Sequence, residues 1–452
     1  MNLSHVFSRV VAVAGATALA SRWLRDGTQE PAWGNAPTVP TGRPQGRIPT
    51  VKIPTAKGWN DGQTPSVASG LNVNAFVTDL THPRWIAVLP GGDVLVAEAS
   101  SVAKETGRSL LDYAWISTMK RAGAMGVSAN RITLLRDADG DGAAEIRETF
   151  LENLNQPFGM ALLHDTFYVG NTDGVVAFPY EAGARSITAP GRKLVAFKTD
   201  GHWTRSLLPS PDGRKLYVGV GSLTNIGRKG MQAEAARAAI HELDLASGTS
   251  RIFASGLRNP VGMAWEPATG ALWTVVNERD GLGDETPPDY LTSVRDGGFY
   301  GWPYSYWGQI VDDRVPQDPA MVTRAITPDY ALGGHTASLG LCWLPAGTLP
   351  GFPAGMVIGQ HGSWNRSKLS GYKVVFVPFA NGRPAGPARD ILWGFLAPDE
   401  RTSYGRPVGV AIAPDNSLLV ADDVGHVIWR VTGEAKHRGH GTRPNENGAS
   451  ES

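Results

Sequence analysis

Several polar residues lie directly beside short apolar runs, where a strand scaffold would present them to one site. His202 precedes the run Ser206–Leu208, and a histidine near neutral pH can remove the proton of a hydroxyl group. Arg258 and Asn259 precede another such run, and together they offer hydrogen-bond donors to an anionic ligand that carries carbonyl groups. A structural histidine and an arginine paired between neighbouring elements are the alternatives for these positions.

Further basic side chains occur at similar positions later in the chain. Arg366 and Lys368 follow the apolar run 355–360, and Arg406 stands before Pro407 as Asn259 stands before Pro260. The chain is neutral overall, with 42 Lys and Arg against 42 Asp and Glu. This balance gives no electrostatic argument for binding nucleic acid or an anionic membrane surface. Convergence of these basic residues on one point would indicate a compact polyanionic ligand.

Two acidic stretches have the residue types of a calcium site. The first matches the pattern D-x-[DN]-x-[DN]-G-x5-E, which predicts the ligands Asp137, Asp139, Asp141 and Glu148. The second is the loop 277–285, where Glu278 and Asp280 are the candidate ligands. An acidic turn whose aspartates accept hydrogen bonds from their own backbone is the alternative for the first stretch, and a solvated turn for the second.

A repeated hairpin supplies the elements that must position these residues. A strand, a turn rich in Pro, Asp and Gly, and a second strand recur at 83–98, 157–171, 205–221, 260–277, 339–360 and 407–422. The copies recur about every 65 residues, whereas a four-stranded blade needs only about 40–45, so long loops are expected. A single hairpin cannot bury its apolar faces, so the copies must pack around a common axis. The sequence therefore predicts an all-β fold, a six-bladed β-propeller with long inter-blade loops.

The predicted propeller spans residues 71–432, with one short helix expected at Met231–His241. Residues 1–20 carry an apolar run and an A-x-A-like site, which predicts a signal peptide or an N-terminal anchor. Residues 21–70, with seven prolines between 31 and 65, are predicted to be an extended linker, and 433–452 a disordered tail. We therefore expect an exported, periplasmic protein with a possible membrane tether. The single cysteine, Cys342, excludes an intrachain disulfide.

These motifs, in this order, resemble the pyrroloquinoline quinone (PQQ)-dependent sugar dehydrogenases, and within them the soluble glucose and L-sorbosone dehydrogenase-like enzymes. The resemblance extends over about residues 70–432 and is carried by the segments 201–222, 256–265, 277–285, 361–366 and 405–411. It implies a six-bladed propeller with PQQ across one face. Soluble glucose dehydrogenases carry Gln-Gly-Pro at the cofactor loop, where this chain has Glu278-Arg279-Asp280.

The resemblance also implies roles for individual residues. His202 would be the base that takes the substrate's hydroxyl proton, and Arg258 would hold the quinone oxygen that gains charge. Asn259, Arg366 and Arg406 would contact the cofactor's carbonyls and carboxylates, with Lys368 as a further candidate. Calcium beside the cofactor would be held by the 277–285 loop and polarise the quinone.

The expected activity is oxidation of a sugar or a sugar-derived aldehyde or alcohol by hydride transfer to PQQ. Because the chain has no haem motif, the electron acceptor would be a separate cytochrome or quinone. Two other classes stay open at this point: a calcium-dependent lactonase-like hydrolase, and a non-catalytic propeller that binds a protein or glycan. The first would use acidic and Asn ligands in the pore, and the second would leave His202 structural.

Overall fold

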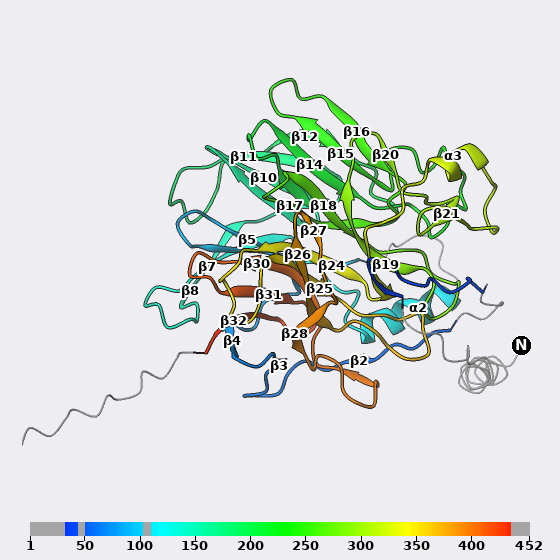
Figure 1. Cartoon of the computed structure of the whole chain (residues 1–452). Coiled ribbons are helices and arrows are strands. Elements are labelled where there is room, and N and C mark those ends of the chain that lie inside the picture. Colours follow the sequence, from blue (N-terminus) through cyan, green and yellow to red (C-terminus); the bar gives the residue numbers. More distant parts are fainter. Residues whose placement is uncertain (1–31, 44–49, 103–109, 435–452) are drawn as a thin grey trace, which may run out of the picture.

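Six antiparallel sheets follow one another around a central axis in the computed structural model, which describes residues 32–43, 50–102 and 110–434 (Figure 1). Each sheet is one propeller blade, and its first strand lies innermost. The inner strand of each blade contacts that of the next, and β30 contacts β5, so the ring is closed. The inner strands are β5 (Pro83–Val88), β9 (Gly159–Leu163), β13 (Leu207–Pro209), β17 (Pro260–Glu266), β24 (Ser338–Leu344) and β30 (Pro407–Ile412).

The second strand of each blade pairs with the inner strand, and these six pairs are the six hairpins that the sequence predicted. The six-bladed fold is thereby confirmed. The second strands are β6 (Val94–Glu98), β10 (Thr166–Asn171), β14 (Lys215–Val220), β18 (Ala271–Val276), β25 (Gly355–Gln360) and β31 (Leu418–Asp422). The third strands are β7 (Arg131–Arg136), β11 (Gly174–Pro179), β15 (Ala239–Asp244), β19 (Pro288–Val294), β26 (Lys373–Ala380) and β32 (Val427–Gly433).

The outermost strands show how the chain closes its ring, which the sequence did not determine. Blades one to five take their fourth strands from their own repeats, β8 (Ile146–Leu151), β12 (Arg192–Ala196), β16 (Ser250–Ser255), β23 (Tyr330–Gly334) and β28 (Arg389–Trp393), and in blades three to five one further short strand pairs outside the fourth. The sixth blade instead takes β4 (Leu71–Val77) from the other end of the chain, paired with β32. The first and last parts of the propeller are thus joined by a strand ladder.

A glycine in the hairpin signature has a packing role at the propeller axis. A Cβ on Gly340 would lie 2.0 Å from the carbonyl oxygen of Val408 on the neighbouring inner strand, and one on Gly262 would lie 2.7 Å from that of Leu339. Such distances are far inside van der Waals contact with backbone atoms. Glycine recurs at this position because adjacent inner strands approach too closely for a side chain.

The proline-rich segment does not form the predicted linker. In its described parts, β1 (Trp33–Gly34) pairs with β23, β2 (Thr55–Ala56) with β29 (Thr402–Ser403), and β3 (Ser66–Val67) with β28. Proline keeps these stretches extended, and an extended chain can add to a sheet edge as well as it can span solvent. The expectation of a free linker over 21–70 is therefore wrong for residues 32–43 and 50–70.

Two helices are seen in the described residues, α2 (Leu110–Arg121) and α3 (Pro319–Arg324). The helix expected at Met231–His241 is wrong, because turns occupy 231–236 and β15 begins at Ala239. Short strands complete the loops: β20 (Gly298–Phe299), β21 (Ser305–Tyr306), β22 (Ile310–Val311) and β27 (Arg383–Pro384). None of the helices in the described ranges has the length and apolar character needed to cross a bilayer. The predicted leader 1–20 lies outside the described residues, as does almost all of the predicted tail.

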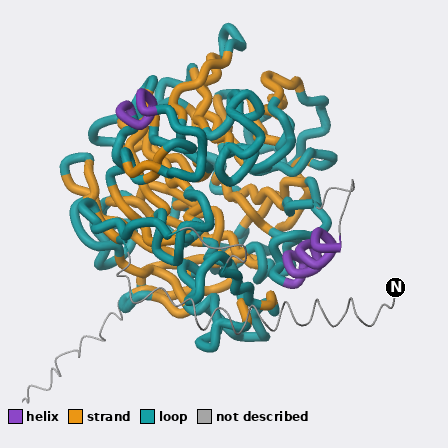
Figure 2. Tube along the Cα trace, turned by 90° about the vertical axis from the view of Figure 1, so that its right-hand side faces the viewer, coloured by secondary structure: helices purple, strands orange, loops and turns teal. Residues whose placement is uncertain are grey.

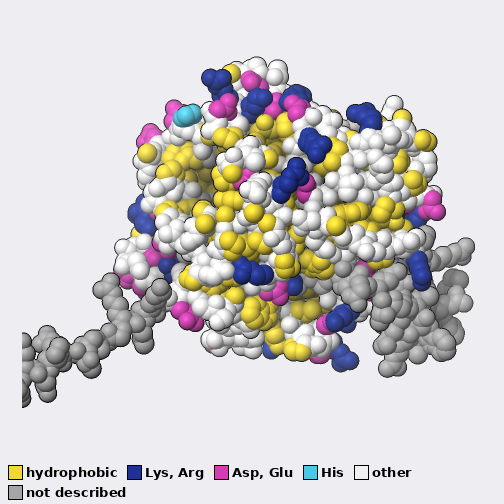
Figure 3. Space-filling model, viewed as in Figure 1, with side chains coloured by type: hydrophobic (Ala, Val, Ile, Leu, Met, Phe, Trp, Pro, Cys, Tyr) yellow, Lys and Arg dark blue, Asp and Glu magenta, His cyan; other side chains and the backbone are white. Residues whose placement is uncertain are grey.

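Loops and both described helices are visible on one face of the ring. Figure 2 looks onto the face that carries α2 and α3, where long loops cover the strands. On the side drawn in Figure 3, acidic and basic side chains are interspersed between apolar ones. The hydrophobic core lies between the blades; one cluster joins Trp85 and Phe158 to Val261, Leu339 and Val408, from five different repeats. This packing fixes the inner strands whose ends carry the polar residues described next.

Candidate active site

A cavity of about 250 Å³ lies where several inner strands begin. Four of the residues predicted to bind a cofactor or act in catalysis line it: His202, Arg258, Asn259 and Arg406. They come from the third, fourth and sixth repeats, so convergence at the axis is what brings them together. The other polar lining residues include Asn277, Glu278, Asp280, Asp289, His335 and His361.

His202 is held in the form that a proton acceptor needs. Its Nδ1 lies 2.8 Å from the carbonyl oxygen of Ser222, which can only accept, so Nδ1 carries the proton and Nε2 has a free lone pair. Burial and, to a smaller extent, the nearby Arg258 together lower the pKa of His202 to about 3. The imidazole is therefore neutral at physiological pH.

Arg258 and Asn259 lie beside His202, and Arg258 is fixed there by main-chain and side-chain acceptors. Arg258 donates to the carbonyl of Glu278 at 2.8 Å and to Oδ1 of Asn225 at 3.0 Å, so its guanidinium has one orientation. The Oδ1 of Asn259 is buried without a partner among the described atoms. A Cβ on Gly221 would lie 2.2 Å from that Oδ1 and 2.7 Å from Cβ of His202. Gly221 therefore leaves the space in which the two side chains meet.

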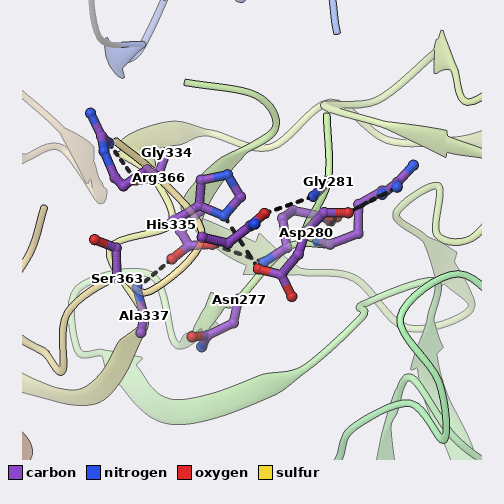
Figure 4. A network of polar contacts seen from close by, with 12 residues as sticks. Asn277, Asp280, Gly281, Gly334, His335, Ala337, Ser363 and Arg366 are labelled. Carbon is purple, nitrogen blue, oxygen red and sulfur yellow. Dashed lines mark hydrogen bonds and ion pairs between the residues drawn. The ribbon is translucent and has the colours of Figure 1, made fainter. Parts of the chain in front are cut away.

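Only part of the predicted basic convergence is present. Arg406 lines the cavity and uses Nε and one terminal nitrogen on the carbonyls of His361 and Gly362, at 2.9 Å each. Arg366 does not line it, because its guanidinium pairs with Glu285 and donates to the carbonyl of Gly334 (Figure 4). Lys368 is exposed and also outside the cavity lining. Arg366 and Lys368 are therefore not among the residues that line this cavity, and their contact with a cofactor stays a prediction.

The acidic residues of the 277–285 loop have different surroundings. Asp280 lies 3.3 Å from Nδ1 of His335 (Figure 4), and its pKa is lowered because His335 and Arg258 outweigh the effect of burial. Glu278 has a buried Oε1 without a described partner, and burial raises its pKa to about 7. Of the two predicted metal ligands in this loop, Glu278 is the one with a carboxylate oxygen that has no described hydrogen-bond partner.

Sequence reasoning missed a second polar group at the cavity. His361 lines the cavity, and its Nε2 donates to Asp423 at 2.9 Å; Arg84 pairs with the same carboxylate. Burial would raise the pKa of Asp423, but His361, His82 and Arg84 outweigh it and keep the carboxylate charged. His361 stood in a recognised motif, but nothing in the pattern placed its side chain next to residues 84 and 423.

The first predicted calcium loop forms an acidic cluster away from the cavity, between β7 and β8. Ligand atoms of Asp137, Asp139, Asp141 and Glu145 lie within 4.8 Å of one another, the one such group of three or more found in the described residues. Glu148 lies outside this cluster, on β8, where it pairs with Arg185. The aspartates also accept backbone hydrogen bonds, as at Gly140 and Gly142. Calcium binding here stays a prediction.

Comparison with known proteins gives the family. A family model described as TrAA12-like matches residues 123–288 and 310–434, more than half of the chain. The chain belongs to the TrAA12-like family. The resemblance to PQQ-dependent sugar dehydrogenases that the motifs indicated is thereby confirmed, and with it the predicted oxidoreductase class.

Two curated relatives of this TrAA12-like chain come from fungi. A "Pyrroloquinoline quinone-dependent pyranose dehydrogenase" of Coprinopsis cinerea is 24% identical over 434 residues, 81% of this chain and 55% of the relative. A "Pyrroloquinoline quinone-dependent sugar dehydrogenase" of Hypocrea jecorina is 24% identical over 375 residues, 72% and 77% of the two chains. The chain thus spans about half the length of the Coprinopsis protein.

A solved structure of the Trichoderma reesei enzyme of family AA12 has the same fold. It matches with a TM-score of 0.67 at 22% identity and covers 83% of this chain and all of the other. In this TrAA12-like chain, His202, Arg258, Asn259 and Arg406 lie within the segments matched by the family model. Residues 50–57 and α2 lie outside those segments.

Proposed function

We propose that this protein oxidises a sugar, or a sugar-derived aldehyde or alcohol, with PQQ as cofactor and His202 as the base. The observation that carries the proposal is the free Nε2 of a neutral histidine, held beside Arg258 in one cavity. The curated relatives named as PQQ-dependent dehydrogenases support it.

The cavity residues fit a planar polyanion such as PQQ. Arg258 and Arg406 supply positive charge, and the unpartnered Oδ1 of Asn259 can accept a hydrogen bond from an N–H group of the cofactor. Arg406 keeps one terminal nitrogen beyond those bound to carbonyls. These three residues would hold the cofactor. Glu278, with its spare buried oxygen, is the residue of the 277–285 loop that would hold calcium beside it.

When bound, PQQ supplies a carbon that accepts hydride from the substrate. The chain's own part is to place the substrate's hydroxyl group against Nε2 of His202, which takes its proton. Ser222 keeps the imidazole in the required tautomer through the carbonyl at 2.8 Å. Arg258, whose side chain is buried, would stabilise negative charge that develops next to it. Electrons would then pass to a separate cytochrome or quinone. The predicted leader at 1–20 supports an exported location.

The proposal is tested with the full chain loaded with PQQ and calcium. We expect saturable PQQ binding by absorbance titration, and reduction of an artificial electron acceptor with at least one sugar or aldehyde of a broad panel. Binding should weaken about tenfold or more in Arg406→Gln, because a charged contact is lost. A chain that neither binds PQQ nor turns over any substrate would contradict the proposal. Lactone hydrolysis without PQQ would instead support the hydrolase alternative.

A further inference from the structure

One loop of the third blade contacts both His202 and Arg258. It covers residues 222–238, lies between β14 and β15, and consists of turns and bends; we call it the 222–238 loop. The N–H of Ser222 donates to the carbonyl of Arg258 at 2.8 Å. The carbonyl of Ser222 accepts from the backbone N–H of His202 at 3.1 Å and from its Nδ1 at 2.8 Å. The first residue of the loop therefore links the two side chains.

Arg237, near the end of this loop, holds the carbonyl groups around His202. Its guanidinium donates to the carbonyl of Lys198 at 2.9 Å, and its second terminal nitrogen is shared between the carbonyls of His202 and Ser222, at 3.1 and 3.4 Å. Arg205 also donates to the carbonyls of Lys198 and His202, at 2.9 Å each. Of the three contacts, only that with Ser222 is made by Arg237 alone. Arg237 thus holds the carbonyl that determines the tautomer of His202.

Asn225 has an equivalent relation to Arg258. Its Oδ1 accepts from a terminal nitrogen of Arg258 at 3.0 Å and from the N–H of Asp280 at 2.9 Å, and its Nδ2 donates to the carbonyl of Asp280 at 3.0 Å. The carbonyl of Asn225 accepts from the indole of Trp302, also at 3.0 Å. Because an amide group offers both a donor and an acceptor, Asn225 joins the guanidinium of Arg258 to the 277–285 loop.

Glu234 fixes the stretch between these two contact points. Its buried carboxylate accepts from the N–H groups of Leu223 and Thr224, at 2.7 and 2.9 Å, and from the hydroxyl of Thr224 at 2.9 Å. Hydrogen bonds to an ionised acceptor are stronger than those between neutral groups. The main chain from Ser222 to Asn225 is therefore held in one conformation from inside the loop.

We propose that the 222–238 loop positions both groups that act on the substrate and cofactor, with Arg237 and Asn225 as its positioning residues. Arg237 holds the Ser222 carbonyl, so that Nδ1 of His202 keeps its proton and Nε2 its lone pair. Asn225 holds the guanidinium of Arg258 beside the cavity. Neither Arg237 nor Asn225 lines the cavity, so each acts through its neighbour. This inference rests on the proposed function.

Arg237→Gln tests the contact with Ser222. We expect kcat to fall about tenfold or more, because small misplacements of a reacting group are costly. PQQ affinity should stay within about twofold of the wild type, because the charged contacts to the cofactor remain. Arg228→Gln is the matched control, since Arg228 belongs to the same loop and its side chain is exposed. The control should keep the wild-type kcat.

The pH profile of kcat distinguishes the charge of Arg237 from its geometry. Burial lowers the pKa of His202 most; of the charged groups that face it, Arg258 and Arg237 lower the pKa further and Asp280 raises it. Removing the charge in Arg237→Gln raises this pKa, so activity should be lost at a higher pH than in the wild type. Arg237→Lys keeps a charge without the planar fork. It should lower kcat and leave the acid side of the profile in place.

The tautomer of His202 can be measured without cofactor or turnover. Imidazole ¹⁵N shifts distinguish a ring that is protonated at Nδ1 from one protonated at Nε2, and the signals missing in His202→Gln are those of His202. We expect the Nδ1–H form in the wild type and in Arg228→Gln, and a mixture of both forms in Arg237→Gln. A folded Arg237→Gln with the wild-type tautomer, kcat and pH profile would remove Arg237 from this role.

Asn225→Ala should give a different set of changes. Because Arg258 loses an acceptor at 3.0 Å, we expect PQQ to bind about tenfold more weakly, whereas the tautomer of His202 and the acid side of the profile should stay as in the wild type. Gln232→Ala, an exposed amide of the same loop, is the matched control. If Asn225→Ala folds poorly, Asn225→Gln displaces the amide by one methylene and should weaken PQQ binding too. Equal PQQ affinity in the Asn225 variants and the control would contradict the role of Asn225.

Thermal unfolding of each variant without cofactor shows which of them are folded, and the wild type separates this inference from the proposed function. A wild type that binds PQQ and turns over, with folded variants that keep its kcat, pH profile and PQQ affinity, would overturn the inference and leave the proposed function standing. A wild type without PQQ binding or turnover would overturn both.

Discussion

Three histidines line the same cavity, and their hydrogen bonds give them different protonation states. His202 donates from Nδ1 and His361 from Nε2, so each keeps one free ring nitrogen. His335 lies 2.8 Å from the carbonyl of Gly283 through Nε2 and 3.3 Å from Asp280 through Nδ1, so both of its nitrogens donate. Burial lowers the pKa of His335, but Asp280 outweighs this effect and the net pKa is raised. His335 is thus a cation, and His202 is the acceptor that stands next to Arg258.

Replacing His202 tests its role directly. We expect His202→Gln to lower kcat by more than about a hundredfold, since general-base catalysis typically contributes 10²–10⁴-fold. PQQ affinity should change little, because the substituted side chain is neutral as the imidazole was. Steady-state kinetics and a PQQ titration measure both. Lys368→Gln serves as control, since Lys368 is exposed and should not affect kcat; equal activity in the two variants would remove His202 from the mechanism.

Buried neutral histidines also predict how stability depends on pH. The pKa values of His82, His202 and His361 are lowered, chiefly by burial, to about 4, 3 and 3. Between these values and about 6.5 the unfolded chain binds more protons than the folded one, so the free energy of unfolding rises with pH in this window. These three histidines therefore contribute a fall in melting temperature as the pH drops from 6.5 towards 4, and the buried Glu278 and Asp422, with pKa values raised to about 7 and 6, oppose it.

The contribution of one histidine can be isolated by calorimetry across that range. His202→Gln should flatten the curve of melting temperature against pH, because about 1.4 kcal/mol per unit of pKa difference is removed. The exposed His164 offers a matched control as His164→Asn, since asparagine tolerates its positive φ of 54°. Identical slopes in His202→Gln and the wild type would contradict the buried, neutral state of His202.

For single residues, the sequence predicts location in the fold when the residue's position in the hairpin repeat determines it. His202, Arg258, Asn259 and Arg406 stand at the start of inner strands, so counting along the hairpins predicts their convergence. Arg366 escaped the same reasoning because Glu285, 81 residues earlier, takes its guanidinium. Only the folded chain places these two side chains together.

At the scale of elements, the acidic loop in the first blade shows how context changes a motif. In the pattern D-x-[DN]-x-[DN]-G-x5-E, the last glutamate normally lies on a helix that follows the loop. Here the loop joins two antiparallel strands, β7 and β8, and Glu148 lies inside β8 and pairs with Arg185. Glu145, three residues earlier, lies in the loop and completes the cluster instead.

Calcium addition and chelation test this loop. We expect saturating calcium to raise the melting temperature, and a chelator to reverse the rise, because a ligand that binds only the folded state stabilises it. Glu145→Gln should reduce the calcium-dependent shift markedly. Glu148→Gln, the matched control, should keep it. A calcium-dependent shift that is lost in Glu148→Gln and kept in Glu145→Gln would support Glu148 as the ligand, as the motif predicts. No shift in the wild type would exclude a metal here.

At the scale of the whole molecule, the ring depends on close approach of the inner strands. A Cβ on Gly340 would meet the backbone of β30 at 2.0 Å, and backbone cannot move aside as a side chain can. We expect Gly340→Ala to destabilise the protein by several kcal/mol, as overpacking of a core does by about 1–3 kcal/mol or more. Gly91→Ala should be near neutral, because no atom lies within 4 Å of its Cβ position. Denaturant unfolding of both variants measures the difference.

The repeat predicted the ring because similar hairpins must pack around a common axis. The position of segment 50–57 on the propeller could not be predicted from the local sequence pattern. Its prolines indicate an extended chain, but they do not tell whether the chain crosses solvent or lies on a sheet edge. What decides this is the pairing of Trp59 with Asp422, 363 residues later, which has no local signal.

The pairing of β4 with β32 sets the order in which the molecule can be completed. β4 is made early in synthesis, and its partner is among the last strands to be made. Until β32 has been synthesised, the edge of β4 that pairs with it is free, and unpaired strand edges are prone to aggregation. Because contacts so distant in sequence form slowly, the ring closes only after synthesis has passed the sixth blade. An early stop in translation would leave every repeat before it intact in sequence, yet yield a chain that cannot close.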